Sequence, residues 1–191
     1  EGAYSMTMIH ENSLLAMRDP FGFRPLYVGS SNGMTAVASE TCALDILRIE
    51  NYRCIEPGEI VYIGSDGMAS SMLKQQRPKR QCIFELIYFA RPDSQVFGES
   101  VHDTRKKMGQ AMAAIDSVDA DVVVPVPDSG NIAALGYAEE SGIPFEMGLQ
   151  RNHYAGRSFI LPTTGERELA VRMKLHPVKT AISGKRIVVI D

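Results

Sequence analysis

The sequence predicts two regions of different fold class, an α+β region followed by an α/β region. Up to residue 73, short runs typical of strands alternate with Asn, Gly and Pro, and only one stretch has a helical pattern. From residue 82 onward, apolar runs typical of buried strands alternate with helical patterns, as in a parallel sheet. A polar, basic stretch, KQQRPKR, separates the two patterns. We predict a first domain at 1–73, a solvated linker at 74–81 and a second domain at 82–191.

The strands of the first region are brief and bounded by turn residues. GSDG at 64–67 is a good hairpin turn between two of them. One helix is expected at 41–48, with Ser39 or Thr41 placed to cap its N-terminus. The predicted strands are 4–10, 13–18, 26–29, 34–38, 59–63 and 68–73.

The second region contains one clear strand–helix–strand unit. DVVVPV at 121–126 is a continuous apolar run, the signature of a strand buried on both faces. A turn at 127–130 breaks this run, and 131–141 has a helical pattern that Gly142 closes. A strand at 143–146 then implies a parallel sheet with a right-handed crossover. We also predict a helix at 101–115 and a buried strand at 185–191.

Composition and charge exclude several classes of protein. The chain has 191 residues, of which 45% are hydrophobic and 23% charged, as in globular proteins. A net charge of -3 argues against a nucleic-acid or membrane surface, and no apolar run is long enough to span a bilayer. The three cysteines have neither CxxC spacing nor a His cluster, which predicts no disulfide framework or zinc site. We expect a cytoplasmic protein, and a chain that begins inside a domain because its start resembles neither an initiator Met nor a signal peptide.

Two candidate ligand-binding positions follow predicted strands of the second region. The turn PDSGN at 127–131 opens a helix and presents backbone N–H groups, which suits a phosphate or a metal-bound hydroxyl. Asp191 ends an apolar strand and suits a hard divalent cation. Ser129 is equally explained as an ordinary helix cap and Asp191 as a turn residue. A nucleotide or sugar-phosphate site and these structural roles therefore both stay open.

The connection at 149–185 is unusually long for a compact domain. It is rich in Gly, Thr and basic residues, which suits a lid that closes over a pyrophosphate. A solvated excursion is the alternative, but Tyr154, Phe159 and Ile160 interrupt the charge with groups worth burying. The basic residues are Arg151, His153, Arg157, Arg167, Arg172, Lys174 and Lys179.

Motifs in the first region resemble a known class of domain. RDPFGFRPL at 18–26, ASE at 38–40 and EPGE at 56–59 are similar to the later part of an N-terminal-nucleophile glutaminase domain. The run at 18–26 alone is explained by a tight, hydrogen-bonded loop and shows no catalysis.

Motifs in the second region narrow the resemblance to one family. CIFELIYFARPDS at 82–94, PVPDS at 125–129 and NHYAGRSFI at 152–160 follow the glutamine phosphoribosylpyrophosphate (PRPP) amidotransferases in order and spacing. The match covers essentially the whole chain. The resemblance implies the C-terminal part of a glutaminase domain followed by the first half of a type I phosphoribosyltransferase domain with a parallel sheet.

The family's reaction uses glutamine as nitrogen donor. Ammonia released at the glutaminase site passes through a channel and displaces pyrophosphate from PRPP, giving phosphoribosylamine, glutamate and pyrophosphate in the first step of purine synthesis. The family's nucleophilic Cys, with its assisting Arg and Asn-Gly pair, is expected upstream of Glu1, and the rest of the PRPP loop after Asp191. We therefore expect this chain to be inactive alone.

The resemblance also implies a substrate site. Asp128, Ser129 and Asp191 match residues that bind PRPP, and Ser129 and Asp191 lie beside its Mg²⁺ ion. A cation there would neutralise charge on the departing pyrophosphate. Arg157 and Lys174 match the flexible loop that closes over PRPP and excludes water.

Other matched positions concern the ammonia channel and a cofactor. Phe84, Tyr88 and Phe159 match aromatics that line the channel, with plain core packing as the alternative for each. Cys82 matches a ligand of a [4Fe–4S] cluster in one branch of the family, whose other ligands would lie beyond this chain. His153 departs from the arginine more usual at its position, which puts the anion contact there in doubt.

The resemblance implies partners as well. Glutamine and PRPP are the expected substrates, purine nucleotides the expected feedback inhibitors, and a homo-oligomer the expected assembly. Three rivals stay open: a glutaminase-coupled enzyme with another acceptor, a non-catalytic PRPP-sensing or regulatory homologue, and a module that binds nucleic acid through the basic loop. The net charge of -3 disfavours the last.

Overall fold

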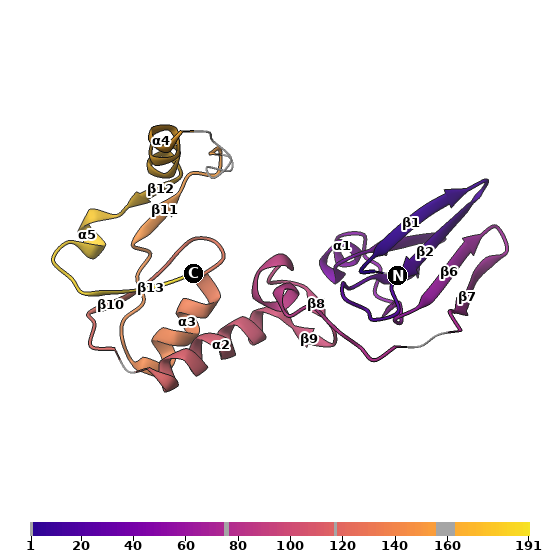
Figure 1. Cartoon of the computed structure of the whole chain (residues 1–191), viewed down its shortest axis with the longest axis horizontal. Helices are drawn as coiled ribbons and strands as arrows, with labels where there is room; N and C mark the ends of the chain where they lie inside the picture. Colours follow the sequence, from indigo (N-terminus) through magenta and orange to yellow (C-terminus); the bar gives the residue numbers. More distant parts are fainter. Residues whose placement is uncertain (1, 75–76, 117, 156–162) are drawn as a thin grey trace. The chain divides into compact units, whose positions relative to one another are not determined.

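A computed structural model describes residues 2–74, 77–116, 118–155 and 163–191 of the chain (Figure 1). The chain divides into two compact units, Glu1–His102 and Asp103–Asp191, hereafter the first and the second unit. Antiparallel sheets build the first unit, and the second contains a parallel strand pair. The predicted combination of sheets and helices, with parallel pairing in the second region, is confirmed. The predicted domain ranges, 1–73, 74–81 and 82–191, follow from the change in sequence pattern, and they stay predictions.

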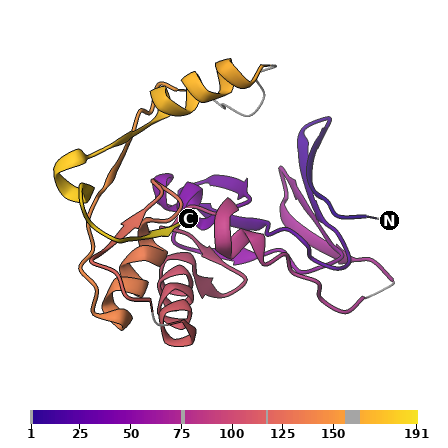
Figure 2. The same ribbon diagram turned by 60° about the vertical axis from the view of Figure 1, so that its left-hand side comes forward.

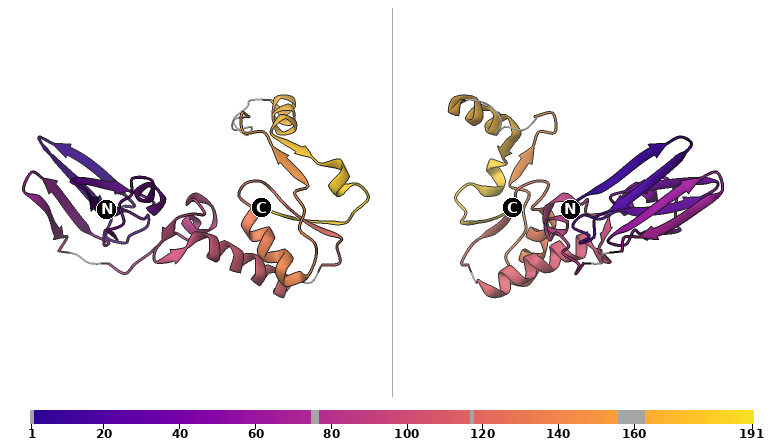
Figure 3. Two further views of the ribbon diagram at one scale, coloured as in Figure 1. Left: turned by 180° about the vertical axis from the view of Figure 1, so that it is seen from behind. Right: turned by 45° about the vertical axis from the view of Figure 1, so that its right-hand side comes forward.

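Two antiparallel sheets make up most of the first unit. The larger sheet has the strand order β1-β2-β6-β7 (Figure 3), and the smaller one the order β4-β3-β5. Gly64 and Gly67 pair at the end of the β6–β7 hairpin, where the hairpin turn is predicted. The strands are β1 Ser5–His10, β2 Ser13–Arg18, β3 Tyr27–Ser31, β4 Met34–Ala38, β5 Tyr52–Cys54, β6 Glu59–Gly64 and β7 Gly67–Met72.

Strand β3 is buried on both faces, so it lies at the centre of the unit. Val28 packs in a cluster with Ala16 of β2 and Val61 of β6, which joins the two sheets. Its neighbour Tyr27 points the other way, because side chains alternate along a strand, and packs with Leu44. Leu44 lies on the helix α1 (Thr41–Ile46). The layers are therefore sheet, sheet and helix.

The prediction that Ser39 or Thr41 caps α1 is wrong. Glu40 occupies the cap position, and no side chain there hydrogen-bonds to the helix. The polar side chains of this region instead bond to residues far along the chain. Glu40 accepts a hydrogen bond from Ser94 Oγ at 3.0 Å, and Thr41 Oγ1 accepts one from Gln95 N–H at 2.9 Å. A contact across more than 50 residues thus replaces the local cap.

The chain from residue 77 to 102 packs within the first unit. Arg80 and Cys82 donate backbone hydrogen bonds to the carbonyls of Phe21 and Phe23, at 2.8 and 3.0 Å. A π-helix and a short hairpin follow, and Tyr27 donates its hydroxyl hydrogen to the backbone of that hairpin at 3.1 Å. Burial raises the pKa of Tyr27 to about 12, so this hydroxyl stays a donor. The new elements are η1 Glu85–Phe89, β8 Gln95–Val96 and β9 Glu99–Ser100.

A buried carboxylate ties β5 to β6. Glu59 accepts two hydrogen bonds from Arg53, at 2.6 and 2.8 Å, and one from Glu56 N–H at 2.8 Å. Burial by itself raises the pKa of Glu59, but the bonds from Arg53 and from the Glu56 N–H outweigh it, so the pKa lies below its usual value. A carboxyl with a lowered pKa stabilises the fold above its unfolded pKa and loses that contribution as pH falls through the folded pKa.

The variant Glu59→Gln is expected to lower the free energy of unfolding of the first unit by about 1.5–3 kcal/mol near pH 7, because a charged hydrogen-bond acceptor is lost. The difference from the wild type should shrink below about pH 4.5, the usual pKa of the carboxyl. Urea unfolding at several pH values measures both effects. A difference that stays constant down to about pH 3 would contradict the proposed charge contribution.

The second unit is built on the parallel pair of β10 (Val122–Pro125) and β13 (Ile187–Ile190). The helix α3 (Asn131–Ser141) follows β10 as predicted and ends at Gly142, whose φ of 72° is left-handed. The predicted strand at 143–146 is reduced to a single parallel bridge between Val123 and Phe145. Pro144 lacks the N–H that a longer ladder needs.

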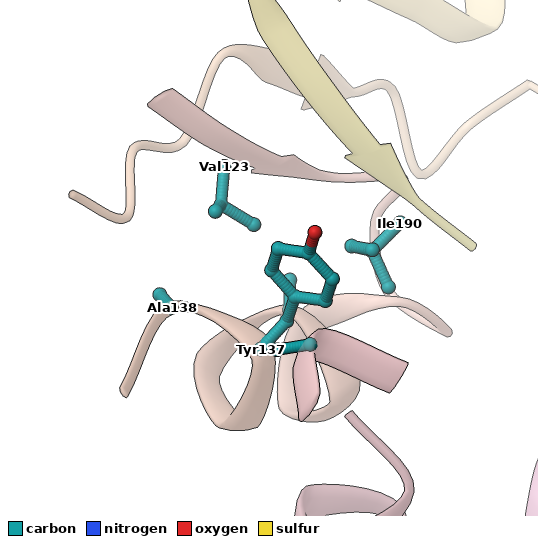
Figure 4. Packing of buried hydrophobic residues seen from close by; sticks show 6 residues of the cluster. Val123, Tyr137, Ala138 and Ile190 are labelled. Atoms are coloured by element: carbon teal, nitrogen blue, oxygen red, sulfur yellow. The ribbon is translucent and has the colours of Figure 1, made fainter. Parts of the chain in front are cut away.

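The core of the second unit lies between α3 and the strand pair. Tyr137 points from α3 toward Val123 of β10 and Ile190 of β13 (Figure 4). All three side chains are buried, and they belong to one cluster. The small residues Ala134 and Ala138 of α3 also belong to this cluster and let the helix approach the strands closely.

The helix α2 (Val101–Ile115) has its predicted bounds and lies beside α3 (Figure 2). The contact depends on two glycines. A Cβ atom at Gly109 would collide with the backbone oxygen of Ala133, and one at Gly136 with that of Lys106. The two helices therefore touch backbone to backbone.

The long connection at 149–185 contains regular structure. Strands β11 and β12 pair antiparallel, and the helix α4 lies between them along the chain. Thr163 caps α4 by accepting a hydrogen bond from Glu166 N–H at 3.3 Å. The elements are β11 Leu149–Arg151, α4 Thr164–Lys174, β12 Leu175–Pro177 and α5 Lys179–Ile182.

Candidate functional site

The strand pair β10–β13 brings two distant loops together at its carboxyl ends. The N–H of Val126 donates to the carbonyl of Ile190 at 2.7 Å, and the N–H of Gly130 donates to the carbonyl of Val126 at 2.9 Å. These bonds curl the chain after β10 toward the end of β13. In open α/β sheets, such an edge is where ligands bind.

Ser129 and Asp191 meet at this edge. The hydroxyl of Ser129 donates to Oδ1 of Asp191 at 2.8 Å, although the two residues are 62 positions apart. Asp191 is exposed and Ser129 half-buried, so a solute can reach both. A hydroxyl and a carboxylate are hard oxygen ligands of the kind Mg²⁺ prefers, and Mg²⁺ usually completes its shell with water and substrate oxygens. The two side chains therefore fit a Mg²⁺ site.

The turn also contributes Asp128, whose ion-pair partner could not be identified from the sequence. Asp128 pairs with Arg151 at the end of β11, with Nη1 of the arginine 2.7 Å from Oδ2 of the aspartate. Arg151 appeared in the sequence only as one of many basic residues of the long connection. Only the pairing of β11 with β12 fixes its position, and that pairing is not visible in a sequence pattern.

Two buried polar atoms close to this turn lack a hydrogen-bond partner. They are Oδ1 of Asn131, at the start of α3, and Nε of Arg151. A buried acceptor and a buried donor without partners are costly in a native protein. Their presence beside the turn is consistent with a polar ligand at this edge.

The predicted loop residues are not assembled with Ser129 in the part of the chain that the structure describes. Lys174 ends α4, and its carbonyl accepts a hydrogen bond from Asn152 N–H at 2.8 Å. No side chain of α4 is buried. Arg157 and Phe159 lie outside the described residues.

The predicted channel residues Phe84 and Tyr88 belong to the first unit. Phe84 precedes η1 and Tyr88 lies within it, and their side chains are 55% and 62% exposed. Both rings approach Phe89, with centroids 6.1 Å from its own. Within the first unit they form an exposed aromatic surface, and their place in the ammonia channel stays a prediction.

The described residues alone do not supply an iron–sulfur site, and the predicted cluster would take its other ligands from outside this chain. Cys82 is half-buried and unbridged, and the other cysteines, Cys42 and Cys54, are also free thiols. Across 2–74, 77–116, 118–155 and 163–191, no group of three or more His, Cys, Asp or Glu side chains could hold a metal ion. A cluster needs four ligands, mostly thiolates.

None of the helices within the described ranges is long and apolar enough to cross a membrane.

Comparison with known proteins shows what the chain is similar to. No family model matches it. It is 52% identical over 192 residues to amidophosphoribosyltransferase 3, chloroplastic, of Arabidopsis thaliana, and 47% identical over 205 residues to the amidophosphoribosyltransferase of Methanocaldococcus jannaschii. Both alignments include all of this chain. The chain is a homologue of the amidophosphoribosyltransferases. It spans 36% and 44% of the length of these two relatives.

Solved structures of similar sequence agree. Glutamine PRPP amidotransferase from B. subtilis, complexed with ADP and GMP, superimposes with a TM-score of 0.88 at 45% identity, over 99% of this chain and 42% of that one. A structure described as the allosteric regulatory enzyme of purine biosynthesis gives the same score and identity over 98% of this chain and 40% of its own. The resemblance of the motifs to glutamine PRPP amidotransferases is thereby confirmed.

The names of the amidophosphoribosyltransferase relatives do not fix one cellular location. The plant proteins are chloroplastic by name, whereas others come from the bacterium Rhizobium etli and from an archaeon. The predicted cytoplasmic location therefore stays a prediction.

Proposed function

We propose that the protein containing this chain is an amidophosphoribosyltransferase, which transfers ammonia from glutamine to PRPP and yields phosphoribosylamine, glutamate and pyrophosphate. The observation that carries the proposal is the 47–52% identity of the whole chain to proteins of that name. The Ser129–Asp191 pair at the carboxyl ends of two parallel strands supports it. We assign 1–73 to the glutaminase domain, 74–81 to the linker and 82–191 to the phosphoribosyltransferase domain.

In this proposal the turn after β10 and the end of β13 hold the substrate. Asp128, Ser129 and Asp191 bind PRPP, and Ser129 and Asp191 hold its Mg²⁺, which neutralises charge on the pyrophosphate. The hydrogen bond from Ser129 orients the Asp191 carboxylate before substrate arrives. Arg157 and Lys174 belong to the loop that covers the site, where charge-assisted contacts strengthen once water is excluded.

The remaining assignments concern ammonia and regulation. Phe84, Tyr88 and Phe159 line the path of neutral ammonia, for which apolar walls suit better than charged ones. Purine nucleotides are proposed as feedback inhibitors, which the ADP and GMP bound to the B. subtilis protein support. A homo-oligomer is also proposed. A [4Fe–4S] cluster at Cys82 would need further ligands from outside the described residues, so no step depends on it.

An assay of the full-length gene product tests the reaction. Mixed with glutamine, Mg²⁺ and PRPP, the protein should release glutamate and pyrophosphate in equal amounts, and the release of glutamate should depend on PRPP. Glutamate release that is indifferent to PRPP would indicate another acceptor. PRPP binding without release of glutamate would indicate a PRPP-sensing homologue instead.

The variant Ser129→Ala tests the substrate site. Loss of the hydroxyl removes a Mg²⁺ ligand and the hydrogen bond that orients Asp191, so we expect the KM for PRPP to rise about tenfold or more. Steady-state kinetics with varied PRPP measure it. Ser141→Ala makes the same chemical change at the other end of α3 and should leave KM within about twofold. Equal effects of the two variants would contradict the assignment.

A further inference from the structure

The π-helix η1 is anchored by apolar contacts on one side only. The backbone hydrogen bond that defines this π-turn runs from the N–H of Ala90 to the carbonyl of Glu85, at 3.1 Å. Leu86 and Ala90 are buried in a small cluster with Val96 and Val101. The other apolar side chains of η1 are exposed, by 42% at Ile87 and more at Tyr88 and Phe89. Short π-helical segments are often found at functional sites.

Arg24 contacts both ends of η1 on the other side. Its Nε forms an ion pair with the carboxylate of Glu85, the first residue of the helix. Its guanidinium carbon lies 4.5 Å from the ring centroid of Phe89, the last residue, which is a cation–π distance. One side chain of the tight turn at 18–26 therefore bridges the whole helix.

This bridge rests on a rigid base. The carbonyl of Arg24 accepts a hydrogen bond from Nε of the buried Arg18 at 2.8 Å. Glu40 fixes the chain just after η1, because its carboxylate accepts the N–H of Arg91 at 2.7 Å and the hydroxyl of Ser94 at 3.0 Å. Both supports come from loops of the first unit, so η1 is oriented by that unit.

The polar bridge is needed because apolar side chains do not fill this side of η1. Arg24, Glu40, Glu85 and Phe89 line a pocket of about 440 Å³. The Glu85 side chain is only 4% exposed, and Arg24 is its ion-pair partner. Burial, and to a smaller degree Glu40, raises the pKa of Glu85, and Arg24 opposes this. Without Arg24, the carboxyl would be buried beside another carboxylate.

We propose that Arg24 is a positioning residue, which acts through Glu85 and Phe89 to fix the direction in which η1 presents Phe84 and Tyr88. The inference rests on the proposed function, in which those two rings line the path of ammonia. In this proposal Arg24 takes part in neither glutamine hydrolysis nor the attack of ammonia on PRPP. A displaced η1 therefore disturbs the delivery of ammonia and leaves the two chemical steps intact.

Arg24→Met in the full-length enzyme tests this. Glutamine-dependent formation of phosphoribosylamine should fall about tenfold, as expected when groups that guide a reactant are misplaced by a fraction of an ångström. Formation from saturating external ammonium should change less than about twofold, since it does not use the internal path. Arg24→Lys keeps the charge but not the planar contact with Phe89, and should be intermediate.

The first unit offers a matched control. Arg53 and Glu59 form an ion pair whose side chains are 45% and 5% exposed, against 44% and 4% for Arg24 and Glu85. Arg53→Met breaks a pair of the same kind away from η1. It should leave the ratio of glutamine-dependent to ammonium-dependent rates unchanged, whatever it does to stability.

A double variant separates positioning from stability. Arg24→Met with Glu85→Met removes both charges and relieves the buried, unpaired carboxyl, so stability should return toward the wild type. The low ratio of glutamine-dependent to ammonium-dependent rates should persist. A ratio that recovers with stability, or that never fell, overturns the inference. A wild-type enzyme without PRPP-dependent activity would instead overturn the proposed function.

Discussion

Replacing Arg18 with methionine is expected to lower the free energy of unfolding of the first unit by about 3–5 kcal/mol, because three carbonyls lose a charged donor. Arg18 is only 2% exposed. Its guanidinium donates to the carbonyls of Ile55 at 2.6 Å, Arg24 at 2.8 Å and Gly22 at 3.0 Å. Methionine fills similar volume but offers no donor, so these oxygens are left without that bond.

Hydrogen exchange of the full-length protein measures this effect locally, which suits a protein of several units better than one global unfolding curve. In Arg18→Met, peptides that cover β2 and β6 should exchange faster, by the factor that corresponds to the expected loss in free energy of unfolding. Arg48→Met is the control, because Arg48 is exposed, and it should change stability by no more than about 0.5 kcal/mol. If Arg48→Met accelerated exchange as much as Arg18→Met, the buried hydrogen bonds of Arg18 could not be the cause of its effect.

The same turn shows how far the sequence could predict the fold. Its arginines, prolines and glycine predict a tight, hydrogen-bonded loop, and the structure confirms this. Asp19 accepts the backbone N–H groups of Phe21 at 2.9 Å and Phe23 at 3.1 Å. The contact of Arg24 with η1 could not be predicted, because it joins residues about 60 positions apart. Local chemistry predicts the turn, whereas packing decides what the turn holds.

The candidate site likewise contains contacts that could be predicted from the sequence and contacts that could not. Ser129 and Asp191 each follow an apolar run, and parallel strands end at a common edge, so their meeting could be predicted. The pair of Asp128 with Arg151 could not. It depends on β11 pairing with β12 across a connection that the sequence describes only as long and basic. The large apolar residues of α4, Leu169, Val171 and Met173, are exposed, so this helix buries no apolar face that a sequence pattern could have revealed.

We expect the second large effect from Gly136→Ala, which should lower the free energy of unfolding although helix propensity alone would raise it. Alanine normally stabilises a helix relative to glycine by up to about 1 kcal/mol. In α3, however, the added Cβ would collide with the backbone oxygen of Lys106 in α2, which cannot rotate away as a side chain can. Overpacking of this kind outweighs propensity, so the second unit should lose about 2–3 kcal/mol.

Gly165→Ala is the matched control, since Gly165 also lies in a helix, α4, and a Cβ there would meet nothing within 4 Å. This variant should be neutral or more stable by up to about 1 kcal/mol. Hydrogen exchange of peptides covering α2 and α3 measures the first variant, and peptides covering α4 the second. If Gly136→Ala slowed exchange as well, α2 and α3 would not pack backbone to backbone, because propensity alone would then decide the sign.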